Sequence, residues 1–203
     1  MTRFLLKNMK IILGKKLGMS QVFDETGKVI PVTLLEAGPC KVLEVLNKEK
    51  NGYDSIQLGF IERKEKKALK SGKGKNFTYI KEFRGEGEFN VGDTVDVSIF
   101  EEGDMVKVSG VSKGKGFQGG VKRHGMSGRD RTHGVKHDHR TIGSVGSAWP
   151  QRVIKGRHMP GRMGADRVSV KNLKVIKIDK ENNTIAVKGA IPGHYGTLIE
   201  VRG

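Results

Sequence analysis

The stretch SKGKGFQGGVKRHGMSGRDRTHGVKHDHR (Ser112–Arg140), continued by TIGSVGSAWPQRVIKGRHMPGRMG (Thr141–Gly164), divides the chain into unlike parts. From Ser109 to Gly164, twelve lysines and arginines face only two acidic residues, which gives this segment a charge of +10. The segment also holds thirteen of the 29 glycines and five of the six histidines. Its few apolar residues follow neither the strand nor the helix period, so the pattern predicts an extended basic arm.

Strand patterns lie on both sides of the arm. Before it, KLGMSQVF (Lys16–Phe23) and KVIPVTLLEA (Lys28–Ala37) are separated by the turn sequence DETG. After it, LKVIKID leads through the turn KENN (Lys180–Asn183) into TIAVKG (Thr184–Gly189), with apolar residues alternating along each segment. The arm is therefore predicted to be an insertion within one β-domain, held at both ends, and not a terminal tail.

The predicted fold class is mainly β: a small closed β-barrel domain with a helical or loop insertion and a long extended basic arm. Several short, evenly spaced strands favour a barrel because closure removes exposed sheet edges. An open sandwich is the alternative. The expected division is an N-terminal extension at 1–8, a globular domain at 9–108 and 165–203, and the arm at 109–164. The charged run ERKEKKALKSGKGK (Glu62–Lys75) places the helix or loop insertion at 61–90.

Composition restricts the partners. The 203 residues carry a formal net charge of +16, which attracts polyanions such as nucleic acid. The mean hydropathy is −0.45 and no apolar run of about 18 residues occurs, so no membrane partner is expected. Cys40 is the only cysteine, which excludes an internal disulfide and predicts a small buried or half-buried side chain.

The arm carries the candidate RNA-binding residues. Cations spaced every two to five residues can pair with successive phosphates, and glycines let the backbone approach RNA closely. Arginine, histidine and the single tryptophan can stack on unpaired bases. The candidates are Lys113, Lys115, Lys122, Arg123, His124, Arg129, Arg131, His133, Lys136, His137, His139, Arg140, Trp149, Arg152, Lys155, Arg157, His158 and Arg162.

Other kinds of site are disfavoured. GKGFQG (Gly114–Gly119) matches the dinucleotide-binding spacing, but glycines interrupt the helix that should follow it. His133, His137 and His139 would share a metal only on a regular helix, which Gly134 weakens. No cofactor, metal, catalytic residue or small-molecule substrate is therefore predicted. A basic RNA-processing enzyme and a nonspecific DNA-compacting protein remain the alternatives to a structural RNA-binding protein.

Three segments carry a family resemblance. They are MKIILGKKLGMSQVFDETGKVIPVTLLEAGPCKV (Met9–Val42), SKGKGFQGGVKRHG (Ser112–Gly125) and RVIKGRHMPGRMGADRVSVKNLKVIKID (Arg152–Asp179). Together they closely resemble the bacterial large-subunit ribosomal protein L3 family, over Met9 to Gly203. Residues 1–8 precede the usual start of that family.

The resemblance implies a cytoplasmic, ribosome-bound protein that binds large-subunit (23S) rRNA directly and acts early in subunit assembly. It implies a β-barrel on the ribosome surface, beside other large-subunit proteins, and an arm that extends towards the peptidyl-transferase centre. The tip of the arm would lie near 143–152, with Trp149 nearest the catalytic RNA. Peptidyl transfer itself belongs to RNA, so the implied role is that of a scaffold.

The tip departs from the pattern of some family members, in which a glutamine becomes methylated. Here the tip reads SVGSAWPQ, with Trp149 in its place and Gln151 two residues beyond it. The modification is therefore not carried over to this chain.

Overall fold

The computed structural model describes residues 9–63, 75–85, 87 and 89–203. The predicted extension at 1–8 and most of the charged run lie outside the described residues. The described residues form two compact units. The first comprises those up to Val111 together with Arg167–Gly203, and the second is Ser112–Asp166.

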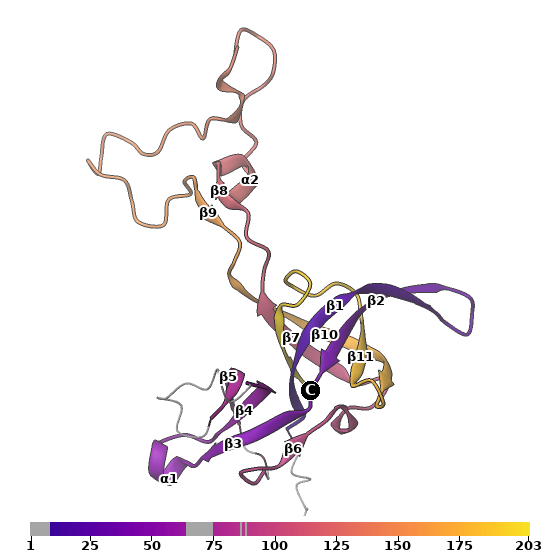
Figure 1. The fold of residues 1–203 in the computed structure, drawn as a ribbon. Coiled ribbons are helices and arrows are strands. Elements are labelled where there is room, and N and C mark those ends of the chain that lie inside the picture. Colours follow the sequence, from indigo (N-terminus) through magenta and orange to yellow (C-terminus); the bar gives the residue numbers. More distant parts are fainter. Residues whose placement is uncertain (1–8, 64–74, 86, 88) are drawn as a thin grey trace, which may run out of the picture. The chain divides into compact units, whose positions relative to one another are not determined.

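Six strands of the first unit form a ring. Every neighbouring pair is antiparallel, and each strand pairs with two others, so the ring has no free edge (Figure 1). The mainly β class predicted from the sequence is confirmed. In order around the ring, the strands are β1 (Ile11–Phe23), β12 (Leu198–Arg202), β7 (Met105–Val111), β10 (Arg167–Asp179), β11 (Thr184–Lys188) and β2 (Val29–Ala37).

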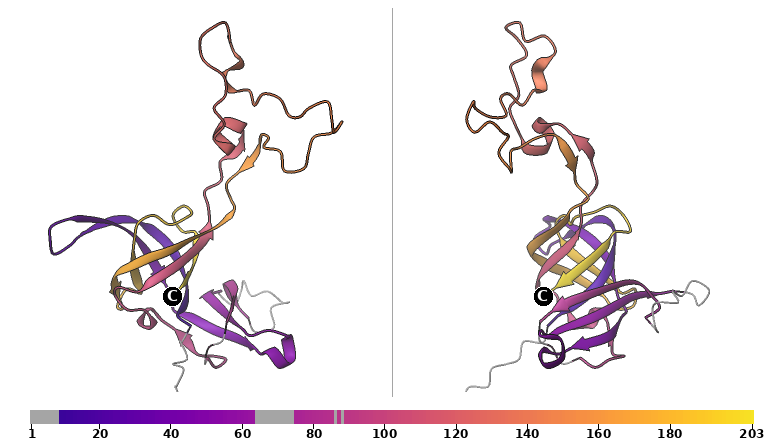
Figure 2. Two further views of the ribbon diagram at one scale, coloured as in Figure 1. Left: turned by 180° about the vertical axis from the view of Figure 1, so that it is seen from behind. Right: turned by 90° about the vertical axis from the view of Figure 1, so that its left-hand side faces the viewer.

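A four-stranded antiparallel sheet accompanies the ring in this unit, and the sequence did not predict it (Figure 2). The chain leaves the ring at Gly38, whose positive φ of 74° turns it from β2 into the next strand. The backbone N–H of Gly38 donates to the carbonyl oxygen of Leu13, which fixes this turn against β1. The strands in order are β5 (Phe77–Arg84), β4 (Ser55–Glu62), β3 (Cys40–Leu46) and β6 (Thr94–Val95).

Strand β5 corrects the predicted helix or loop insertion at 61–90. Residues 77–84 are wrongly assigned by that prediction, because they pair with β4 along its length. Phe77 and Tyr79 are half-buried, while Thr78 and Ile80 between them are exposed, which is the alternation of a strand with one covered face. The charged segment before β5 made this short alternating pattern difficult to recognise in the sequence.

Helical structure in the described residues of this unit is short. It comprises α1 (Lys48–Asn51), which ends at the left-handed Gly52, and the 3-10 turn η3 (Val97–Ile99). None of the helices in the described part of the chain has the length and apolarity that a membrane-spanning segment needs.

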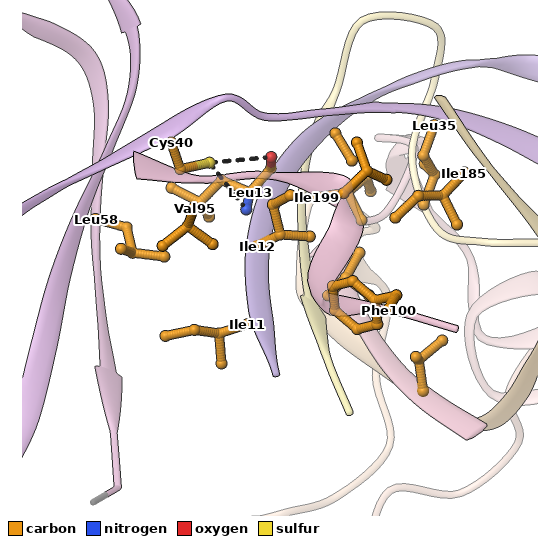
Figure 3. Close-up of a cluster of buried hydrophobic side chains, with 14 of the residues drawn as sticks. Ile11, Ile12, Leu13, Leu35, Cys40, Leu58, Val95, Phe100, Ile185 and Ile199 are labelled. Carbon is orange, nitrogen blue, oxygen red and sulfur yellow. Dashed lines mark hydrogen bonds between the residues drawn. The ribbon is translucent and has the colours of Figure 1, made fainter. Parts of the chain in front are cut away.

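Both sheets contribute to one hydrophobic core (Figure 3). Ile12 and Leu13 of β1 are fully buried, and so is Ile199 of β12. Cys40 begins β3 and lies against Leu13, whose N–H donates to Sγ while the thiol donates to its carbonyl oxygen, each at 3.4 Å. Burial raises the pKa of the Cys40 thiol to about 12, so it is a protonated core side chain at neutral pH, as the sequence predicted.

An ion pair joins Lys10 to the turn before β7. Lys10 Nζ lies 2.6 Å from Asp104 Oδ2, which also accepts the N–H of Glu101 at 3.0 Å. The Lys10 ammonium and that N–H hold the pKa of Asp104 below its usual value. A lowered folded-state pKa means that this stabilisation is complete above the unfolded value of about 4 and disappears as the pH falls through the folded value.

We expect Asp104→Asn to lower the free energy of unfolding by about 1 kcal/mol at pH 7, since the pair is partly solvent-exposed. The difference from the unsubstituted chain should shrink below pH 4. Urea unfolding at pH 7 and pH 3 measures both effects, and Glu25→Gln in the exposed β1–β2 turn is the control. A loss of equal size at both pH values would contradict this assignment.

Candidate nucleic-acid interface

The second unit, 112–166, has almost no interior. All of its residues are described, and Gly120 is the only buried one. Twelve cations against Asp130, Asp138 and Asp166 give the unit a charge of +9. A segment of this length without a hydrophobic core cannot recover its ordering entropy from its own contacts, so a partner must supply the missing burial.

Local order in this unit begins with a two-stranded ribbon. Strands β8 (Gly116–Gln118) and β9 (Gly161–Met163) are antiparallel, and the N–H of Lys115 extends the pairing to the carbonyl oxygen of Met163. The one-turn helix α2 (Gly120–His124) follows β8 and ends at Gly125, which adopts the left-handed conformation. A helix of one turn after β8 does not provide the long helix that a dinucleotide site needs, so GKGFQG is not such a site.

Two side chains of helix α2 contact His158 and Met159, which lie shortly before β9 in the sequence. Arg123 Nη1 donates to the carbonyl oxygen of Met159 at 2.8 Å, and His124 Nε2 lies 3.2 Å from the same oxygen. The His124 ring stacks on His158, with 4.2 Å between centroids and 5° between planes. These contacts join residues 34 to 36 positions apart in the sequence without a hydrophobic core.

A second local contact holds the 128–140 loop. The N–H of Arg129 donates to the carbonyl oxygen of His139 at 2.9 Å, and His139 Nδ1 lies 3.2 Å from the carbonyl oxygen of Asp130. Gly128 has a φ of 76°, and a Cβ there would lie 2.4 Å from the carbonyl oxygen of His139. Only glycine therefore permits this closure, which leads into the 3-10 turn η4 (Asp138–Arg140).

The predicted tip, 143–152, is exposed throughout. Ser144 Oγ donates to the carbonyl oxygen of Gly146 at 2.6 Å, and Arg157 Nη2 donates to the carbonyl oxygen of Ser144 at 2.6 Å. The Trp149 side chain is 78% exposed. An indole ring left in water is available to stack on a base or fill a partner's pocket.

Fifteen of the eighteen sequence-predicted residues are exposed in this unit. Arg123, His124 and His139 are half-buried and make the internal contacts described above. The exposed ones are Lys113, Lys115, Lys122, Arg129, Arg131, His133, Lys136, His137, Arg140, Trp149, Arg152, Lys155, Arg157, His158 and Arg162.

Asp138 and Asp130 make two further contacts in this loop. Asp138 Oδ2 lies 3.9 Å from Arg129 Nη1, and both side chains are more than half exposed. The carbonyl oxygen of Asp130 faces His139. Among the described residues, no group of three or more His, Cys, Asp or Glu side chains is placed to hold a metal ion.

Phe117 is a candidate that sequence reasoning missed. Its side chain is 77% exposed in β8, directly after Gly116, although phenylalanine is usually buried. The signal was available: an aromatic residue in SKGKGFQGG has no apolar neighbour with which to form a core.

The family model for Ribosomal protein L3 matches residues 86–185. The chain is 47% identical to the large ribosomal subunit protein uL3 of Finegoldia magna, over 96% of this chain and 97% of the relative. Identity to the protein of the same name is 49% in Syntrophomonas wolfei, over 91% of each chain. It is 48% in a Geobacillus species, over 95% of each chain.

Proposed function

The chain belongs to the ribosomal protein L3 family, and on that premise we propose that it binds large-subunit (23S) rRNA directly through residues 112–166. It is a structural constituent of the large ribosomal subunit and not an enzyme, so it resides on ribosomes in the cytoplasm. Membership of this family excludes the alternative interpretation as a basic RNA-processing enzyme. Ribosomal RNA and other ribosomal proteins are its partners.

One observation carries the proposed RNA contact: a unit of charge +9 has a defined local structure but no buried side chain. Exposed arginines and lysines on an irregular backbone suit the phosphates of a folded RNA, whose path has no constant repeat. Gly-mediated closures such as that at Gly128 set the spacing of the cations before RNA is present. The unit is therefore partly preorganised, which reduces the ordering cost of binding.

We further propose that the ring of six strands is the closed barrel expected from the sequence, since every strand pairs on both sides. We propose the two-part division predicted from the sequence (9–108 with 165–203, and 109–164), but with its boundaries at Val111 and Arg167, because β7 extends to Val111 and β10 begins at Arg167. The N-terminal extension at 1–8 stays a prediction. We also propose that the chain supports early subunit assembly. The tip of the arm is proposed to reach towards the peptidyl-transferase centre, with Trp149 foremost.

Sedimentation of extract from cells that express the tagged full chain tests the proposed function. We expect the protein in the large-subunit and whole-ribosome fractions, and we expect it to leave those fractions when high salt strips basic proteins from the RNA. Crosslinking with ultraviolet light should then join residues of 112–166 to large-subunit rRNA. A chain that sediments with the ribosome but crosslinks only through residues of the first unit would contradict the assignment of the interface.

A further inference from the structure

The β8–β9 ribbon presents an aromatic ring and a guanidinium side by side. Phe117 in β8 and Arg162 in β9 are directly opposite in the antiparallel register, and both are exposed. Residues opposite each other in such a pair project from the same face of the ribbon. The two side chains therefore share one face.

The opposite face of the ribbon carries the Arg123 side chain of helix α2. A Cβ built on Gly161 would lie 2.6 Å from Nη1 of Arg123, the guanidinium that also donates to the Met159 carbonyl oxygen. Successive residues of a strand point to opposite faces, so Arg162 points away from α2, and Phe117 does the same. The Phe117–Arg162 face is the open one.

The Phe117 ring is left uncovered, since its side chain is 77% exposed. A Cβ built on Gly119, two residues further along the chain, would also meet no atom within 4 Å. Lys115, two residues earlier, is exposed as well. An apolar ring is thus bordered by cations in a unit whose only acidic residues are Asp130, Asp138 and Asp166.

We propose that Phe117 and Arg162 form a clamp for one unpaired nucleotide, whose base stacks on the phenyl ring while the guanidinium pairs with its phosphate. This inference rests on the proposed rRNA binding and adds the class of ligand at one place in the interface. A nucleotide combines a flat apolar face with an anion, which is the complement of the ring and its cationic border. A base within a duplex has both faces covered, so the ligand is a bulged, looped or terminal nucleotide.

Substitutions at 117 separate stacking from general apolar contact. Phe117→Leu keeps an apolar side chain but removes the aromatic face, whereas Phe117→Tyr keeps the ring. We expect the leucine variant to lose about 5- to 100-fold in affinity for transcribed large-subunit rRNA, as aromatic stacking on one base implies, and the tyrosine variant to bind as the unsubstituted chain does. Because the site is exposed, all three chains should melt at the same temperature.

Chemical probing of the bound rRNA identifies the nucleotide. With the unsubstituted and tyrosine chains, one nucleotide outside a duplex should be protected, and with the leucine chain it should become reactive. Arg162→Gln should expose the same nucleotide. If the leucine chain binds with unchanged affinity and an unchanged reactivity pattern, the clamp is wrong while rRNA binding stands. If the unsubstituted chain shows no salt-sensitive binding to the rRNA, the proposed function fails and the clamp with it.

Discussion

Replacing four exposed cations of the second unit, Lys122, Arg131, Lys136 and Arg140, with glutamine is expected to weaken binding to large-subunit rRNA by about 100-fold at physiological ionic strength. Each cation that pairs with a phosphate releases condensed counterions, so the plot of log affinity against log salt should become shallower by about 3. Titration with transcribed rRNA at several salt concentrations measures both quantities. None of the four makes the internal contacts of Arg123 or Arg129, so the local structure should persist.

The matched control removes the same charge from the first unit. Lys28, Lys107, Lys177 and Lys188 are all exposed there, and their replacement by glutamine changes the net charge equally. If general attraction to a polyanion accounted for binding, both variants would lose affinity alike. Equal losses would therefore contradict the assignment of rRNA binding to the second unit. Equal affinity of the unsubstituted chain for duplex DNA and rRNA would instead support a DNA-compacting protein.

The second large effect is expected in the core. Leu13→Ala should lower the free energy of unfolding by about 3 kcal/mol, because Leu13 is completely buried in β1 and the substitution leaves a cavity. For a chain of this size, the melting temperature should fall by about 6 to 12 °C. Thermal unfolding followed by circular dichroism measures this shift.

Met19→Ala on the same strand is the control, since the Met19 side chain is 57% exposed. Its effect should stay within about 0.5 kcal/mol. The folded Leu13→Ala chain should bind rRNA with unchanged affinity, because the proposed interface lies in the second unit. A loss below 1 kcal/mol for Leu13→Ala would mean that the core does not depend on this contact.

Much of the ring could be predicted from local patterns. Strong alternation and clear turn residues define β10 and β11, and the turn DETG joins β1 to β2 where Gly27 has a positive φ. The assignment of strands to two sheets could not be predicted, because it depends on the single turn at Gly38 and on pairing between distant segments. In the same way, Val97 and Phe100 are buried as strand residues would be, yet the chain between them forms a 3-10 turn.

Composition indicates a nucleic-acid interface, but it cannot show which basic residues of that interface face outward and which make internal contacts. Lys122 and Arg123 are adjacent cations with the same apparent role, yet only Arg123 turns inward to the Met159 carbonyl oxygen. His124 and His158 stack although no periodic pattern relates them, since the intervening backbone is irregular. Such contacts depend on individual backbone angles, which glycine-rich sequence leaves undetermined.

The paired residues Val111 and Arg167 fix both ends of the second unit at adjacent places on β7 and β10. The segment between these two residues can be treated as one loop. The pairing of β7 with β10 holds the two ends of this loop together. The entropy of closing such a loop grows only with the logarithm of its length, by about 0.6 kcal/mol per doubling. Lengthening or shortening the segment thus changes the stability of the ring very little. A change in the length of this segment can therefore match the dimensions of the binding partner while the globular unit stays the same.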